Sequence, residues 1–393
     1  MSARILHHIL ACLAPLAALA AGGEARAADT RDFRANFSGY PGFAQYFAAN
    51  PPSSALPGAA DQVLLERHRP RFMLPRDHAG MVDFYADYIA RGRLYDGAGN
   101  LIADKVTREV LNANKDKPDA VFVHERESAR SALPAVYGRI DRDSVDLGNG
   151  VKRRFTFLRY NAVFSQSGQP AGMVGWRAFL VSFIGDLEDW RQLDHAGSAI
   201  VVLDETEHPV ALMLQPHSFH RTYVFGVDAA LPADGRPKLD VAIRSNELYR
   251  HVDGRVEYRA VRFMAPEGMR YLLGGGQRPT MSADDITDSA TEAEYALQFL
   301  PPSDAFYTFK GHLGQRRAMT GREGPPGADY NTLPELKPLG MQLLAGYWHR
   351  GDAGDLGRFE ETYGRSGDPR DFARVQTPKF STALAAARAK IKR

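Results

Sequence analysis

Short segments rich in apolar, β-branched and aromatic residues follow one another from about residue 136 to about residue 273. Some alternate with polar residues and others, such as 199–203 and 210–214, are continuously apolar, and both patterns are typical of β-strands. Gly, Pro, Asp or Asn bounds each segment, and many short strands with turns between them predict an antiparallel β-sandwich. The predicted strands are 136–140, 154–164, 176–184, 199–203, 210–215, 221–225, 239–243, 256–263 and 269–273.

Two other stretches have apolar residues at three- and four-residue spacing, which predicts helices. The first begins near Ala79 and contains Met81, Phe84, Tyr85, Tyr88 and Ile89. The second begins at Ser282, a typical helix cap with acidic residues in the turn that follows, and continues through Glu292, Ala293, Tyr295, Ala296 and Phe299. Helices and strands do not alternate regularly, so a doubly wound parallel sheet is not expected.

These patterns divide the chain into four parts. Residues 1–27 form a signal peptide, and residues 28–135 an amino-terminal segment of loops and helices packed on the core. Residues 136–275 form the sandwich core, and residues 276–393 a carboxy-terminal extension of helices and loops. The predicted fold class is therefore mainly β, an antiparallel β-sandwich with helical amino- and carboxy-terminal additions.

The first residues predict export. Arg4 supplies a short positive region, 5–21 is an apolar stretch, and Ala25-Arg26-Ala27 has the small-x-small pattern of a signal-peptide cleavage site. The alternative is a single membrane anchor. The apolar stretch is short for that and carries His7 and His8. We expect a periplasmic or extracellular protein with no transmembrane segment in the mature chain.

Charge and cysteine content exclude several classes of function. The 49 basic and 47 acidic side chains give a formal net charge of +2, without the excess positive charge that nucleic-acid binding needs. The single cysteine, Cys12, lies in the apolar stretch, where lipid attachment is the alternative interpretation. Once residues 1–27 are removed, the chain has no thiol for a disulfide, a metal thiolate or a nucleophile.

The densest polar constellation lies between Gly185 and His195. It contains Asp186, Glu188, Asp189, Asp194 and His195, together with Trp190 and Arg191. Carboxylates gathered in one place repel one another unless a cation, an arginine or a proton offsets their charge. A site for Ca²⁺, Mg²⁺ or Mn²⁺ is one interpretation, and a charged strand end with an arginine partner for Asp189 is the other.

A second cluster, Gln215-Pro216-His217-Ser218-Phe219-His220-Arg221, follows the predicted strand 210–215. A histidine there is either structural or part of a site. A hairpin between the two clusters would bring them together. The predicted ligand-binding residues are Asp189, Trp190, His195, His217 and His220, and the predicted metal ligands are Asp186, Glu188, Asp189, Asp194 and His217.

Residues 69–225 resemble the vacuolar protein sorting-associated protein 62 family. The matching segments are Arg69–Leu74, Val136–Ile140, Leu158–Phe164, Asp189-Trp190 and Val210–His217. The Asp-Trp pair is more distantly similar to the G-H-R-H-D-W-E motif of necrosis-inducing proteins, which are secreted β-sandwiches whose motif helps to hold a divalent cation. This similarity implies that Asp189 is a ligand or an organiser of the site, with His217 opposite.

The chain departs from that motif at two positions. Glu188 replaces a histidine of the necrosis-inducing proteins, and Arg191 replaces a glutamate of both families. A guanidinium there opposes a cation, so either Asp186, Glu188 or Asp194 supplies the ligand instead, or the metal is absent.

Three functions remain open. The first is an exported β-sandwich protein that binds a small molecule, glycan or lipid at an Asp/Glu/His site, directly or through a divalent cation. The second is a metal-assisted or acid–base hydrolase in which His195 or His217 moves the proton. The third is a toxin-like binder of lipids or glycans. The sequence leaves open whether the protein is an enzyme.

Overall fold

The computed structural model describes a set of segments that begins at residue 53. They are residues 53–117, 119–124, 133–148, 150–164, 175, 179, 194–214, 221–243, 246–251, 253, 257–258, 285–286, 291–309, 311–313, 339–347 and 369–391. Strands take up 38% of the structure and helices 26%, so the prediction of a mainly β protein is confirmed.

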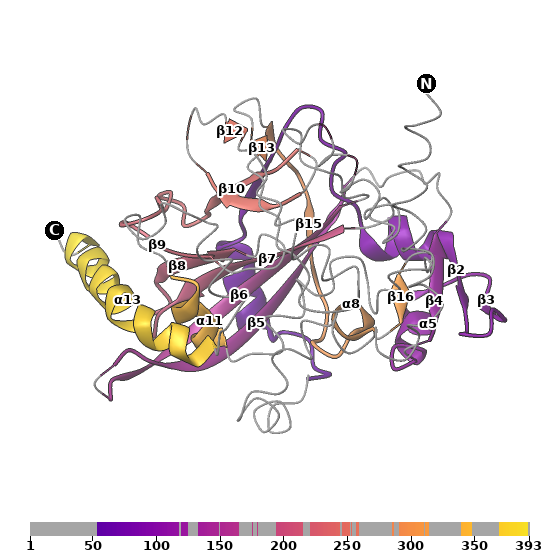
Figure 1. The fold of residues 1–393 in the computed structure, drawn as a ribbon, viewed down its shortest axis with the longest axis horizontal. Helices are drawn as coiled ribbons and strands as arrows, with labels where there is room; N and C mark the ends of the chain where they lie inside the picture. The colour runs from indigo at the N-terminus through magenta and orange to yellow at the C-terminus, as the bar shows by residue number, and fades with distance from the viewer. Residues whose placement is uncertain are drawn as a thin grey trace, which may run out of the picture.

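The centre of the molecule is a six-stranded sheet (Figure 1). Its order is β15-β5-β6-β7-β8-β9, and β5 to β9 form an antiparallel meander. The edge strand β15 pairs with β5 in parallel. The strands are β5 (Ala135–Asp146), β6 (Lys152–Phe164), β7 (Asp194–Leu203), β8 (Pro209–Leu214), β9 (Arg221–Val224) and β15 (Ala296–Phe299).

Alternation along β6 gives the central sheet two different faces. Leu158, Tyr160 and Phe164 enter one hydrophobic cluster, whereas Phe155 and Phe157 enter another. We call these the first face and the second face of the central sheet. Strands predicted from alternation are therefore present, and residues from both of their faces are buried.

The first face is covered by a smaller sheet and by the helix α4 (Ala59–Arg67). This sheet has the order β11-β10-β1-β14 and mixes one parallel pair, β1 with β10, with antiparallel pairs. Phe72, Leu239 and Leu248 of the smaller sheet share one cluster with the first face. The strands are β1 (Arg71–Leu74), β10 (Lys238–Val241), β11 (Leu248–Arg250) and β14 (Thr291–Glu292).

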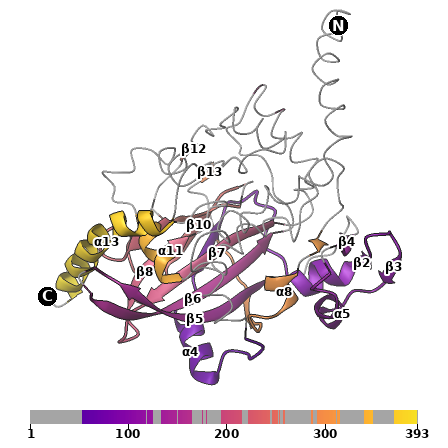
Figure 2. The same ribbon diagram turned by 60° about the horizontal axis from the view of Figure 1, so that its bottom comes forward.

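Two helices cover one end of the second face. They are α11 (Leu339–Ala345) and the long carboxy-terminal α13 (Pro369–Ile391). Leu343 and Phe380 are fully buried there, against Phe157 and Ile200 of the central sheet. Figure 2 shows α13 and α11 on one side of the central sheet and α4 on the other.

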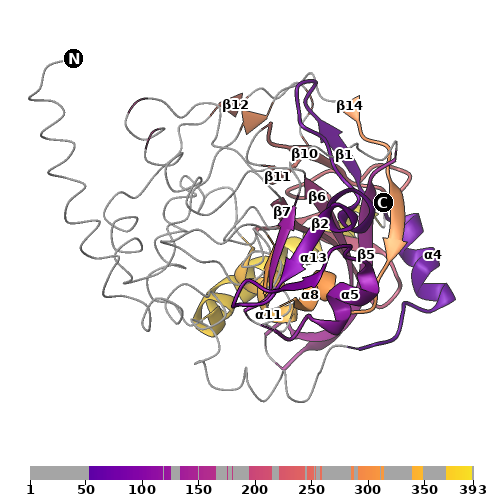
Figure 3. The same cartoon turned by 90° about the vertical axis from the view of Figure 1, so that its right-hand side faces the viewer.

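The other end of the second face meets a small sheet with its own helices. Its order is β16-β4-β2-β3, formed by β2 (Gly92–Tyr95), β3 (Leu101–Ala103), β4 (Val121–His124) and β16 (His312–Leu313). The helices α5 (Arg108–Ala113) and α8 (Ala305–Thr308) lie beside it (Figure 3). Phe122 of this sheet shares a cluster with Tyr137 and Val163 of the central sheet.

The helix predicted near Ala79 is present but short and irregular. Residues Phe84–Tyr88 form one turn of π-helix, and Ile89–Arg91 form a 3₁₀ turn. The amino-terminal segment also contains β1 to β4, which its sequence pattern did not predict.

The helix predicted from Ser282 to Phe299 is wrong. Residues 291–292 and 296–299 are strands β14 and β15. Ala296–Phe299 pairs in parallel with Ala135–Gly138, so that pairing with the rest of the sheet overrides the local helical spacing. The segment therefore extends the central sheet.

Several predicted elements lie outside the described residues. They include the signal peptide, the strand 269–273 and, apart from residue 179, the strand 176–184. The strand predicted over 256–263 is described only at β12 (Glu257–Tyr258), which pairs with β13 (Asp285–Ile286). In the part of the chain that is described, no helix is both long and apolar enough to span a bilayer.

Candidate functional site

The residues predicted as a site divide into two groups. Asp186, Glu188, Asp189, Trp190, His217 and His220 lie outside the described residues. Asp194 and His195 begin β7, where their backbones pair with Phe164 and Val163 of β6. The structure thus describes the backbone at one edge of the predicted site.

The sheet register places the strand ends that flank the two predicted clusters at one end of the central sheet. Strand β7 begins at Asp194, while β8 runs antiparallel to it and ends at Leu214, opposite Ala199. Strand β9 begins at Arg221 opposite that same Leu214. Strand β8 therefore ends, and β9 begins, at the end of the sheet where β7 starts, and we call this the site end of the sheet.

A β-bulge interrupts the pairing of β6 with β7 at the site end. Asn161 pairs with Ser198, but the next pair joins Val163 to His195, so β7 has one residue more than β6 between these pairs. A bulge of this kind bends and twists its strand and often re-aims side chains beside a functional site.

Polar side chains cross the middle of the second face next to this bulge. Arg159 and Asn161 lie on β6 between Phe157, which packs toward α11 and α13, and Val163, which packs toward the small sheet. The Asn161 amide donates a hydrogen bond to the Ser198 hydroxyl over 2.7 Å. We call Arg139, Asp141, Arg159, Asn161 and Ser198 the polar band.

An arginine pair with one shared carboxylate forms the other half of the polar band. Arg159 Nη1 donates to Asp141 Oδ2 over 3.2 Å, and Arg139 Nη2 donates to Asp141 Oδ1 over 3.0 Å. Burial alone would raise the pKa of Asp141, but the positive charges of Arg139 and Arg159 outweigh burial and lower it. The carboxylate is therefore charged, as both of its contacts require.

The buried charges in the polar band are costly to maintain. The Arg159 side chain is 0% exposed, and burying an ion in a protein costs several kcal/mol before its partners offset the penalty. An apolar residue at that point would join the two hydrophobic clusters on either side. The polar band therefore separates the two hydrophobic clusters of the second face.

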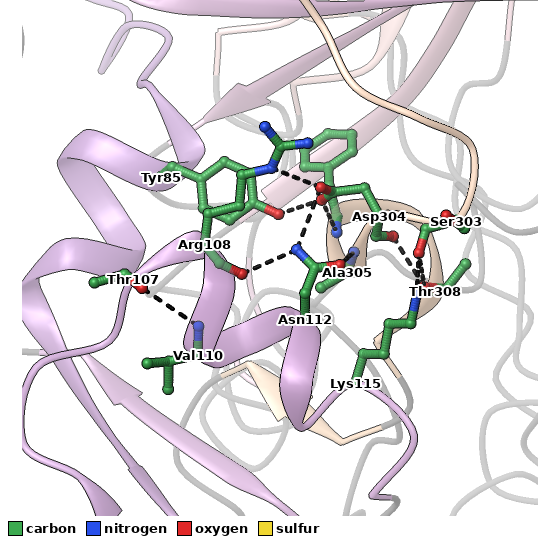
Figure 4. Close-up of polar contacts among 11 residues, drawn as sticks. Tyr85, Thr107, Arg108, Val110, Asn112, Lys115, Ser303, Asp304, Ala305 and Thr308 are labelled. Atoms are coloured by element: carbon green, nitrogen blue, oxygen red, sulfur yellow. Dashed lines mark hydrogen bonds and ion pairs between the residues drawn. The ribbon is translucent and has the colours of Figure 1, made fainter. Parts of the chain in front are cut away.

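A second polar cluster surrounds Asp304 at the start of α8 (Figure 4). Its Oδ1 accepts hydrogen bonds from the Tyr85 hydroxyl and, over 2.9 Å, from Phe306 N. Its Oδ2 accepts from Arg108 Nε over 2.7 Å and from Asn112 Nδ2 over 3.3 Å. Burial and the Asp304 charge raise the pKa of Tyr85, so the phenol stays a donor.

Four donors fill the hydrogen-bonding capacity of the Asp304 carboxylate. Little of that capacity is left for a metal or a substrate. The contacts join α5, α8 and the π-helical turn, and Lys115 adds a hydrogen bond to Ser303 O. We therefore interpret this cluster as a structural clamp between the small sheet and the segment that leads from β15.

Two further findings, on metal ligands and on similarity to known proteins, complete the description of the site. Among the side chains that the structure describes, no three His, Cys, Asp or Glu residues form a group able to hold a metal ion. No protein-family model matches the chain, and neither a curated protein nor a solved structure is significantly similar to it.

The sequence analysis missed the polar band, although the sequence contains a signal for it. Arg159 and Asn161 interrupt the otherwise apolar end of β6, which reads Phe155-Thr-Phe-Leu-Arg-Tyr-Asn-Ala-Val-Phe164. Charged residues are rarely buried without a partner, so an arginine and an asparagine two positions apart on one face of a buried strand indicate a polar network.

Proposed function

We propose that this chain is an exported protein that binds a small polar ligand at the site end of its central sheet. The supporting observation is the polar band, which runs across the second face to the bulge beside Asp194 and His195. In this proposal the band is the rigid, buried support. The residues at the strand ends contact the ligand, either directly or through a divalent cation.

The proposal includes a further pairing of β7 with β8. Ala199 of β7 pairs with Leu214, the last residue of β8. In a continued antiparallel ladder, each residue before Ala199 would pair with one residue after Leu214. If this register continues, His195 faces Ser218 and shares its face of the sheet with the diagonal neighbour His220, whereas His217 faces Ala196 on the opposite face. His195 and His220 would then contribute to one cleft at the site end, together with carboxylates of the 186–194 segment.

We also propose that the central sheet and the smaller sheet are the two layers of a β-sandwich. Phe72, Leu239 and Leu248 pack with Leu158, Tyr160 and Phe164 in a single cluster, which supports this assignment. The ligand site would then lie at one end of the sandwich, where strands meet their connecting loops.

Thermal melting of the exported protein tests the ligand proposal. The compounds are citrate, inorganic phosphate, glucose, maltose and short-chain lipids, each with CaCl₂, MnCl₂ or EDTA. A ligand that binds the native state raises the melting temperature. We expect at least one compound to raise it for the wild type and for His208→Ala, and to have no effect on His195→Ala.

Other outcomes would assign a different function. Turnover of ester, phosphate or glycoside substrates that is lost in His195→Ala would identify the hydrolase. Leakage of phospholipid vesicles would identify the toxin-like binder. An equal ligand response in the wild type and His195→Ala would remove the site end from the proposal.

Export is tested separately by amino-terminal sequencing of the protein recovered from the periplasm or medium. Cleavage after Ala27 predicts a mature chain that begins at Ala28. An intact Met1 on a membrane-bound product would support the anchor instead.

A further inference from the structure

Two arginines from different sheets lie beside one tyrosine ring at the site end. Arg221 is the first residue of β9 and pairs with Leu214, the last residue of β8. Its Cζ lies 5.1 Å from the centroid of the Tyr223 ring, and the Cζ of Arg250, at the end of β11, lies 5.7 Å from the same centroid. The two guanidinium groups are therefore no farther apart than these two distances together.

Alternation along the strands places these side chains between the central sheet and the smaller sheet. Tyr223 belongs to the hydrophobic cluster of the first face, and Arg221, two residues before it, lies on the same face of β9. Leu248 of β11 belongs to that cluster too, so Arg250, two residues later, also faces the central sheet. Tyr223 is buried, whereas both arginines are partly exposed. The two positive charges thus lie at the margin of the apolar layer, where solvent reaches them.

The acidic residues on β10 and next to β11 have partners of their own. Asp240 pairs with Tyr249 in the ladder, and both alternate with residues of the first-face cluster, so they lie on the outer face of the smaller sheet. Asp240 contacts His251, and Glu247 accepts a hydrogen bond from the Tyr249 hydroxyl. Within the part of the chain that the structure describes, Arg221 forms no ion pair with a carboxylate. A positive charge beside a second one favours the approach of an anion.

We propose that Arg221 and Arg250 bind a phosphate group of the ligand at the site end. A guanidinium donates two parallel hydrogen bonds to an oxyanion, and stacking on an aromatic ring holds it in place. This inference deepens the proposed function and rests on it, because it names the group that the site end recognises.

Two arginines favour phosphate over carboxylate. A planar carboxylate is satisfied by one guanidinium fork, whereas a phosphate group has oxygens in several directions and a charge of about −1.5 to −2 at neutral pH. Arg221 and Arg250 extend from the two sheets toward one ring, so they can contact different oxygens of one phosphate.

Isothermal titration of the mature protein with sodium phosphate, in a zwitterionic buffer, tests the site. We expect the wild type to bind inorganic phosphate, and Arg221→Gln and Arg250→Gln each to bind it about 10- to 100-fold more weakly. Arg221→Lys keeps the charge but loses the fork, so its loss should be smaller. The matched control is Arg93→Gln, which removes one positive charge from an exposed ion pair on the small sheet and should bind as the wild type does.

Two further titrations identify the source of the phosphate group. Binding of glycerol 3-phosphate supports a soluble phosphate ester as the ligand. Binding to phosphatidylcholine vesicles only when they contain phosphatidic acid supports a lipid headgroup. In either case we expect Arg221→Gln to weaken the binding.

The melting temperature of Arg221→Gln in phosphate-free buffer shows that the variant is folded. We expect it to be close to that of the wild type, because Arg221 is partly exposed and forms no ion pair with a described carboxylate. Weaker phosphate binding with an unchanged melting temperature supports the inference. Unchanged phosphate binding in Arg221→Gln, equal binding of chloride at the same ionic strength, or no phosphate binding by the wild type overturns it.

The failure of this inference is distinguishable from the failure of the proposed function. If maltose binds the wild type but not His195→Ala, and phosphate does not bind, only the phosphate inference fails. If neither phosphate nor any neutral compound binds, both fail.

Discussion

At Asp304 a single carboxylate holds together three parts of the chain, and its replacement tests the clamp. Asp304→Ala removes the cap of α8 and leaves the Tyr85 hydroxyl without its acceptor. We expect the free energy of unfolding to fall by about 2 to 4 kcal/mol, because buried donors lose a charged partner. Urea unfolding at neutral pH measures the change.

The control for this prediction is an exposed ion pair. Arg93 Nε lies 2.8 Å from Asp104 Oδ1, but both side chains are largely exposed. We expect Asp104→Ala to change the free energy of unfolding by less than about 1 kcal/mol. Equal losses in Asp304→Ala and Asp104→Ala would contradict the interpretation of Asp304 as a clamp.

His68 links stability to pH. Its Nδ1 contacts Gly235 O at 3.2 Å, and burial lowers its pKa below the ordinary value of 6.5. The unfolded chain therefore binds this proton more readily than the folded protein does. Stability should be unaffected by His68 above about pH 6.5 and should fall as the pH drops from there through the folded pKa.

Urea unfolding between pH 7.5 and 5.0 measures this effect, with His68→Gln as the comparison. Glutamine keeps a donor for Gly235 O but does not titrate in this range. We expect the wild type to lose more stability than His68→Gln as the pH falls. Parallel curves for the two proteins would exclude His68 as a source of the pH dependence.

The carboxy-terminal helix α13 packs its apolar residues on the second face of the central sheet. Phe380 is fully buried and meets the Tyr347 ring edge-on at 5.6 Å, whereas Arg388 is partly exposed and contacts Asp204 over 3.0 Å. We expect Phe380→Ala to cost about 3 to 5 kcal/mol because it leaves a cavity. Arg388→Ala should cost less than about 1 kcal/mol.

Thermal and urea unfolding of both variants measure these costs. A larger loss in Arg388→Ala than in Phe380→Ala would mean that charge, and not apolar burial, holds α13 to the sheet.

The same elements show how far the sequence predicts the structure. Strands β5 to β10 were predicted because they are short apolar or alternating segments bounded by turn residues. Strand β15 was misread as a helix, since Ala293, Ala296 and Phe299 have helical spacing and only the partner strand β5 reveals the true state. The π-helical turn at Phe84–Tyr88 has no distinct period from which to predict it.

The candidate site was predicted only in part, for a different physical reason. The sequence predicted a site in 186–195 and 215–221, because acidic residues and histidines are close together there. The polar band instead joins Arg139 and Asp141 of β5 to Arg159 of β6, and Asn161 of β6 to Ser198 of β7. A sequence pattern does not contain the register that aligns these residues. The bulge beside Ser198 is likewise a property of the paired strands.

The two faces of the central sheet differ at the scale of the whole molecule. The first face forms one continuous apolar cluster with the smaller sheet. The second face is apolar at both ends but polar in the middle, where Arg159 is completely buried. Asn161 and Ser198, in the polar middle of the second face, lie beside the site end, where β7 begins and β8 ends. The proposed function depends on the two predicted clusters meeting there.

A disulfide cross-link between residues 195 and 218 tests most directly whether the two predicted clusters lie close together at the site end. The predicted mature chain has no cysteine, so His195→Cys with Ser218→Cys introduces the only two thiols. Cysteines on facing strands can bridge when their Cα atoms are about 4.4 to 6.8 Å apart. After mild oxidation we predict that thiol titration finds no free thiol in this variant. It should find two in His195→Cys with Val227→Cys, because Val227 follows the far end of β9. Two free thiols in both variants would contradict the convergence of the clusters.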